Sequence, residues 1–315
     1  MKSRMLGWVV RGAVWCCLAV LLSAAAAADG PPQRTFSSPE AARQALLDAA
    51  SARDHAAVRA IFGPSSCDLE PGDPAERQVE FERFAAHLKE GALLDRQGDD
   101  RAVLLIGAEK WPFPVPIVKK GDNWRFDTAS GREEILCRRV GYNELSAIRT
   151  VRAYVDAQRE YYAMAEPDGD QIPKYAQRMI STPGRHNGLY WPTAAGEKAS
   201  PLGPAVAKAK EEGYLKARPP GQKGARPYHG YYFRILKRQG KSAPGGAYNY
   251  VINGNMVGGF SLVAYPATWG ESGVMTFIVN QRGRVYQKDL GPKTGKIARA
   301  MKAYNPDQSW KLVEP

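Results

Sequence analysis

The chain has 315 residues, of which 44% are hydrophobic and 24% are charged. This length and this balance are typical of a folded protein with about two domains. The chain is long enough to bury a substantial core, so it does not need metal or disulfide staples to fold.

The first 28 residues differ from the rest. A positive segment is followed by a short apolar run over residues 13–22 and then by the small residues "SAAAAAD". This pattern predicts a secretory signal peptide (1–28), cut near Ala27 or Ala28. The alternative is an uncleaved membrane anchor, but the run is short of the roughly 20 apolar residues that span a bilayer. We therefore expect cleavage, no transmembrane segment afterwards, and a location in the periplasm or at the cell surface.

The net charge of +12 falls to about +9 without the signal peptide, which carries three basic and no acidic residues. The positive charge is spread along the chain, and nucleic acid is not an expected partner of an exported protein. Attraction to an anionic envelope component such as peptidoglycan or lipopolysaccharide is physically reasonable, and an envelope protein is another candidate partner. The alternative is a soluble protein that happens to be basic.

Two cysteines remain after cleavage, Cys67 and Cys137. An even number in an oxidising compartment suggests one disulfide between them. The alternative is a pair of buried, unpaired thiols.

Helices are predicted first along the mature chain. Ser37 or Ser38 caps a helix with Pro39 at its first position, "DHAAVRAIFG" is a second helix, and residues 74–90 are a third. The runs "RAVLLIG", "FPVPIVKK" and "NWRFDT" then read as strands, the middle one at a sheet edge or broken by its alternating prolines. This order predicts a small α+β domain over residues 33–130.

The second half, residues 131–315, is predicted to combine a helix with an antiparallel sheet. Residues 132–164 read as a short and then a long helix, interrupted near Gly141 and Asn143. The expected buried side of the long helix comprises Leu145, Ile148, Val151, Val155 and Tyr162. A short helix is expected around residues 174–179, and another at "PLGPAVAKAKEEGY". Strands at "YHGYYFRILKR", "YNYVING" and "GGFSLVAYP", a hairpin turned at residues 281–283, and a helix over 294–304 complete the chain.

Several long segments carry a resemblance to a known family. They include "WPFPVPIVKKGDNWRFDTASGREEILCRRVGYNEL", "YAQRMISTPGRHNGLYWP" and "GGFSLVAYPATWGESGVMTFIVNQRGRVYQKDLG". Together they resemble the domain of unknown function 2950 family of exported bacterial proteins, over nearly all of the mature chain. The resemblance implies a bacterial envelope protein and no particular activity.

The second half also resembles the globular domain of pseudopilins and pilins, in which a helix lies across an antiparallel sheet. A pilin places its apolar helix at the mature N-terminus, whereas here a whole domain precedes the helix. The resemblance therefore implies a pilin-like fold, and filament assembly does not follow from it.

Catalytic and cofactor signatures are missing from the sequence: there is no His-Glu-x-x-His, Walker loop, Cys-x-x-Cys or Gly-x-Ser-x-Gly. We expect no cofactor. The segment "EPDGDQIPKYAQ" places Glu166, Asp168 and Asp170 like the first ligands of a calcium loop. The glycine and the final glutamate of such a loop are replaced by Gln171 and Gln177, so a solvated acidic turn is the preferred interpretation and no metal is expected.

The candidate ligand surface consists of polar and aromatic residues in the segments that are densest in motifs: Arg185, His186, Tyr190, Trp191, His229, Tyr231 and Trp269. His186 and His229 would be acid–base groups if the fold brought them together with a carboxylate. The aromatic residues would stack on sugar or peptide if exposed, or would form the core between helix and sheet if buried.

Three hypotheses follow from these residues. The first is a non-enzymatic binding or assembly factor of the envelope, which we prefer. The second is a hydrolase that acts on an envelope polymer through His186 and His229. The third is a structural module in which the motifs serve packing alone.

Overall fold

The computed structural model describes residues 32–69, 74–164, 172–193, 196–211 and 227–314. The predicted signal peptide lies outside these residues. The described chain divides into two compact units. The N-terminal unit runs to Trp111 and includes Ile117–Phe126, and the C-terminal unit comprises Pro112–Pro116 and the chain from Asp127 onward.

The N-terminal unit begins with helices α1 (Pro39–Ser51), α2 (His55–Phe62) and α3 (Pro74–Glu90), with a 3-10 helix, η1 (Pro64–Leu69), between the last two. The Ser38 side chain accepts a hydrogen bond from the Ala41 amide, as the sequence predicts for a cap of α1. The buried stripe of α1 consists of apolar residues at helical spacing: Ala42, Leu46, Ala49 and Ala50.

The sheet of this unit has the strand order β1-β2-β4-β5, and β3 also pairs with β2. Its strands are β1 (Ala92–Arg96), β2 (Arg101–Ile106), β3 (Trp111–Pro112), β4 (Ile117–Lys120) and β5 (Asn123–Phe126). The proline-rich run is therefore a broken strand: Pro114 and Pro116 lie outside it, because proline has no amide to give to a ladder.

Helix α4 (Thr128–Ala163) is continuous over 36 residues, so the interruption predicted near Gly141 and Asn143 is wrong. The Asn143 amide donates to the Ser272 carbonyl at 3.0 Å. The Glu144 carboxylate accepts from the Val274 and Met275 amides at 2.9 and 3.0 Å. These contacts offset the cost of about 1 kcal/mol for a glycine inside a helix.

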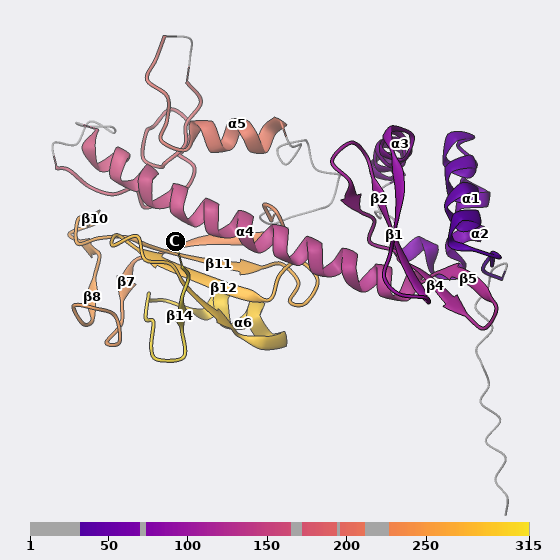
Figure 1. The fold of residues 1–315 in the computed structure, drawn as a ribbon. Helices are drawn as coiled ribbons and strands as arrows, with labels where there is room; N and C mark the ends of the chain where they lie inside the picture. The colour runs from indigo at the N-terminus through magenta and orange to yellow at the C-terminus, as the bar shows by residue number, and fades with distance from the viewer. Residues whose placement is uncertain (1–31, 70–73, 165–171, 194–195, 212–226, 315) are drawn as a thin grey trace, which may run out of the picture. The chain divides into compact units, whose positions relative to one another are not determined.

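The C-terminal sheet has the strand order β14-β13-β12-β11-β6, and α4 lies along one of its faces (Figure 1). Its strands are β6 (Tyr231–Leu236), β11 (Ser261–Pro266), β12 (Met275–Asn280), β13 (Tyr286–Asp289) and β14 (Lys311–Leu312). Two short strand pairs lie between β6 and β11 along the chain. They are β7 (Arg238–Gln239) with β8 (Tyr248–Asn249), and β9 (Val251–Ile252) with β10 (Asn255–Met256). Helix α5 (Gly203–Glu211) precedes β6, and η2 (Gly291–Lys293) with α6 (Thr294–Ala300) follows β13.

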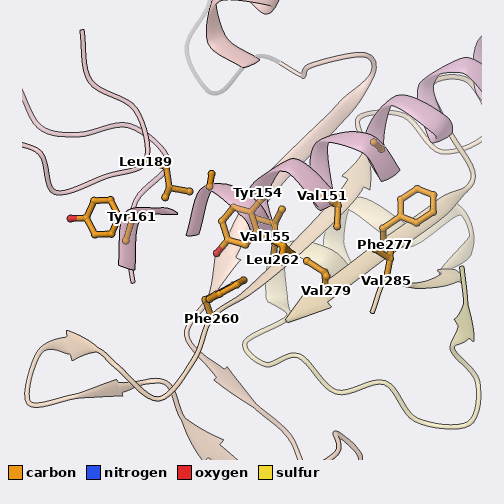
Figure 2. Close-up of a cluster of buried hydrophobic side chains, with 14 of the residues drawn as sticks. Val151, Tyr154, Val155, Tyr161, Leu189, Phe260, Leu262, Phe277, Val279 and Val285 are labelled. Atoms are coloured by element: carbon orange, nitrogen blue, oxygen red, sulfur yellow. The ribbon is translucent and has the colours of Figure 1, made fainter. Parts of the chain in front are cut away.

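Alternation along β11 and β12 fills two cores, one on each face of the sheet. Leu262, Phe277 and Val279 meet α4, as the close-up in Figure 2 shows. Val263 and Ile278 instead meet α6 on the other face. The α+β class predicted from the sequence is confirmed.

The buried stripe of α4 differs from the expected one. Leu145 and Tyr162 are exposed, 58% and 41% respectively. The buried residues of α4 include Ala147, Val151, Tyr154, Val155, Gln158 and Tyr161. This stripe includes a tyrosine and a glutamine because the Gln158 amide donates to the Tyr154 hydroxyl and to the Ala176 carbonyl, and its carbonyl oxygen accepts from the Ala176 amide.

The short helix expected at residues 174–179 is also wrong. The Tyr175 amide donates to the Met256 carbonyl. The Arg178 carbonyl accepts from the Leu189 amide, and the Met179 carbonyl accepts from the Tyr190 amide. The backbone of this segment therefore pairs with distant segments instead of with itself. No helix in the described part of the chain combines the length and the apolar character that a membrane span requires.

Candidate functional site

The loop of residues 181–192 satisfies its own polar groups. The Asn187 side chain accepts from the Thr182 amide at 3.0 Å, and the Ser181 hydroxyl accepts from the Gly188 amide at 3.0 Å. The Ser181 amide donates to the Tyr190 carbonyl at 2.8 Å. These bonds are the pattern of a rigid connection.

The aromatic and histidine side chains of this loop pack on one another. Trp191 is 6% exposed, and the His186 ring stacks on it with centroids 4.4 Å apart and planes 21° apart. The Tyr161 hydroxyl donates to the His186 carbonyl at 2.8 Å. Tyr190 is half-buried, whereas Arg185 and His186 are exposed.

His229 lies in the turn before β6, whereas the sequence placed it in the strand. His229 and Gly230 both have positive φ, 43° and 70°, and Tyr228 and Tyr231 exchange backbone hydrogen bonds around them. A tight turn of this kind requires positive φ, which histidine tolerates better than most residues. The imidazole packs edge-on against the Tyr142 ring, with centroids 5.3 Å apart.

The structure does not bring His186 and His229 together. His186 is held beside Tyr161, and His229 lies against Tyr142. Both tyrosines belong to α4 and are 19 residues apart, which is about 28 Å at 1.5 Å per residue. The joint acid–base site expected of a hydrolase is therefore not formed.

Two further predicted site residues serve the fold. Tyr231 is fully buried, its hydroxyl donates to the Met275 carbonyl at 2.8 Å, and burial raises its pKa far above the ordinary value. The Trp269 indole N–H donates to the Asp289 carboxylate at 2.8 Å. These aromatic groups are partnered within the protein.

The predicted disulfide is not present in the structure. Cys137 is an exposed free thiol, and the side chain of Cys67 lies outside the described residues. The weak calcium candidates Glu166, Asp168 and Asp170 also lie outside them. Within the described ranges, no cluster of three or more His, Cys, Asp or Glu side chains is arranged to hold a metal ion.

A pocket of about 360 Å³ is lined by residues of α4, of α5 and of strand β6 at the edge of the sheet. Its α4 lining follows one helical stripe: Tyr142, Ser146, Arg149, Thr150, Ala153 and Tyr154. Its remaining lining comes from the chain around α5, from the turn before β6 and from β6 itself: Met179, Leu202, Ala205, Val206, Ala209, Pro227, Tyr228, His229 and Phe233. The size is within the usual range for small-molecule sites.

The apolar stripe of helix α5 lines this pocket. The i, i+3, i+4, i+7 spacing of one helix face aligns Leu202, the residue just before α5, with Ala205, Val206 and Ala209. The start of the helix is fixed because the Leu202 amide donates to the Leu189 carbonyl at 2.9 Å. The signal for this stripe is visible in the sequence, but its partner surface on α4 is not.

The polarity of the pocket changes from its exposed rim to its buried end. Tyr154 is fully buried, and its hydroxyl donates a hydrogen bond to the Ser261 carbonyl. Desolvation raises the pKa of this hydroxyl well above its ordinary value. Met179, Leu202 and Phe233 are half-buried. Arg149 is exposed, and its guanidinium donates to the Ser146 hydroxyl at 2.8 Å.

The family comparison covers both units. The family model described as "Protein of unknown function (DUF2950)" matches residues 33–313. The chain belongs to this family. A search of the curated proteins found no match, and a search of the solved structures found none. The likeness to pilins thus stays a prediction.

Every residue that lines the pocket lies within the segment that the DUF2950 model matches. The pocket is therefore built from the family's own domain. Of the predicted ligand-surface residues, only His229 contributes to it.

Proposed function

We propose that this protein is an exported, non-enzymatic binding protein of the bacterial envelope, and that it holds an apolar small molecule in the pocket lined by α4, α5 and the start of β6. Export rests on the signal-peptide pattern of the first 28 residues. The binding role rests on the pocket and its lining.

One observation carries the binding role: the apolar stripe of α5 and a stripe of α4 both line the same pocket. An amphipathic helix in a globular protein normally buries its apolar stripe against its neighbours. Here Leu202 and Val206 remain half-buried and Ala205 exposed. Apolar surface of this kind, gathered in a concave place with a few polar groups at its edge, is typical of a ligand site.

The hydrogen bonds of the hydroxyl groups on the α4 side of the pocket favour a binding role over a catalytic one. The Thr150 hydroxyl donates to the Ser146 carbonyl, and the Ser146 hydroxyl accepts from Arg149. The raised pKa of Tyr154 keeps its phenol protonated at neutral pH. A nucleophile needs a general base within hydrogen-bond reach, and these three groups are engaged elsewhere.

The pocket size sets the expected affinity. Its volume of about 360 Å³ is more than twice the ~150 Å³ of a cavity known to hold benzene, so it holds roughly 14 non-hydrogen atoms. At about 0.5 kcal/mol for each atom, binding contributes about 7 kcal/mol. This corresponds to a dissociation constant of roughly 10 μM.

The test uses the neutral fluorescent probe N-phenyl-1-naphthylamine and the full chain processed in its bacterial host. We expect the probe to brighten on binding, and Ala205→Trp to weaken its binding more than tenfold by filling the pocket. Ala207→Trp is the matched control, because Ala207 is exposed on α5 and does not line the pocket. Equal binding by the two variants, or no binding by the wild type, would contradict the proposal.

Export has its own test. Expression of the complete chain, followed by cell fractionation and N-terminal sequencing, should yield periplasmic or secreted protein that begins within a residue or two of Asp29. Protein that retains Met1 in the membrane fraction would support the anchor alternative, and cytoplasmic protein would overturn export.

A further inference from the structure

The charge of the pocket lining is one-sided. Among the described residues of the lining, Arg149 is the only permanently charged one, and none is an aspartate or glutamate. Within the described ranges, no carboxylate forms an ion pair with Arg149, whereas Arg159 of the same helix pairs with Asp156 at 3.4 Å. The described part of the pocket therefore presents a positive charge that none of its own residues neutralises.

The Ser146 hydroxyl orients this charge. It accepts from Nη2 of Arg149 at 2.8 Å, and one helical turn separates the two residues. A guanidinium has five N–H donors in a fixed fork. This contact uses one of them and leaves donors on the planar edge that matches a carboxylate in a bidentate geometry.

The charge is also correctly placed for an amphiphile. Arg149 is exposed at the rim, while Leu202 and Phe233 are half-buried and Tyr154 closes the buried end. A ligand that fits this gradient has an anionic head at the rim and an apolar chain inside. A neutral apolar ligand would gain nothing from the guanidinium, which stays hydrated at the rim, and a cationic one would be repelled.

We propose that the ligand of this pocket is a medium-chain fatty acid, or a molecule with the same carboxylate head and single apolar chain, and that Arg149 binds the head. This inference rests on the proposed function and names its ligand class. A saturated C12 acid has 14 non-hydrogen atoms, which is about the number that the volume admits by comparison with a benzene-binding cavity.

The test is displacement of bound N-phenyl-1-naphthylamine by dodecanoate and by 1-dodecanol, which share a chain and differ in the head. We expect dodecanoate to displace the probe from the wild type at a concentration at least tenfold lower than dodecanol. Arg149→Met keeps the apolar stem and removes the charge, so it should abolish this preference, while dodecanol should still displace the probe. Arg149→Lys should retain part of the preference, because it keeps the charge and loses the fork.

Arg152→Met is the matched control, since Arg152 is exposed on α4, does not line the pocket, and donates to the Glu314 carbonyl. It should keep the full preference for dodecanoate. Thermal melts of the variants establish that each is folded.

The outcomes separate the two proposals. Equal displacement by the acid and the alcohol in the wild type, or a preference that survives Arg149→Met, overturns the fatty-acid inference while probe binding upholds the pocket. Failure of the wild type to bind the probe, the acid or the alcohol overturns both.

Discussion

The loop of residues 181–192 and the pocket beside α4 contain similar side chains, but they use them differently. Each has a histidine, an arginine and at least one tyrosine. In the loop, the Asn187 and Ser181 side chains accept hydrogen bonds from neighbouring backbone amides, and Trp191 stacks on the His186 ring. In the pocket, the Arg149 guanidinium donates to the Ser146 hydroxyl and faces no carboxylate among the described residues, and the apolar stripe of α5 faces a cavity.

The difference shows that a dense run of chemically versatile residues is a poor guide to a site. What distinguishes a ligand site is a cavity beside donors and apolar surface that the fold has not already used. The loop is therefore expected to affect stability, and the pocket is expected to affect binding. The following variants test this division, in order of expected effect.

Trp191→Ala should have the largest effect, a loss of about 3 kcal/mol in the free energy of unfolding. Trp191 is 6% exposed and contacts the Tyr161 and His186 rings, and truncation of such a residue leaves a cavity in the core. Urea unfolding measures the loss. Because Trp191 does not line the pocket, the folded fraction should bind the probe like the wild type. A variant with unchanged stability that no longer binds the probe would show that the loop acts in binding, which would contradict the division.

Gly141→Ala should stabilise the protein by roughly 0.5–1 kcal/mol, since alanine is the better helix former. Gly141 is exposed inside α4, and a Cβ there would meet nothing within 4 Å. The expected rise in melting temperature is about 2 °C. The control is Gly131→Ala in the same helix, whose Cβ would lie 2.6 Å from Cγ2 of Val115; it should destabilise. A destabilised Gly141→Ala variant would indicate that α4 is broken there and that its pocket stripe is not continuous.

His186→Ala and Arg185→Ala should have the smallest effects. Both residues are exposed, so we expect losses below about 1 kcal/mol, most of it from the stacking of His186 on Trp191. Displacement of the probe by dodecanoate should stay within twofold of the wild type. A tenfold change in the dodecanoate concentration needed for displacement, in either variant, would indicate that the loop belongs to the binding site.

Much of the fold is predictable from local pattern. The cap at Ser38 and the alternation along β11 and β12 depend on neighbouring residues, so the sequence indicates them directly. The continuity of α4 at Gly141 is different, because it depends on the contacts of Asn143 and Glu144 with residues 272–275, more than 120 positions away. Helix propensity contains no information on such contacts.

The site was less predictable for the same reason. The stripe of α5 at Leu202, Ala205 and Val206 can be found from its spacing. The meeting of this stripe with Arg149 around one pocket depends on how α4 and α5 are placed within the C-terminal unit. That arrangement follows from tertiary packing and has no local signature.

The most direct test of the account is a crystal structure of the processed protein grown with 12-bromododecanoate, in which anomalous scattering locates the bromine. The account predicts one bromine between Leu202 and Phe233 and a carboxylate within about 3 Å of the Arg149 guanidinium. A bromine bound at the loop of residues 181–192, or none bound in the pocket, would contradict it.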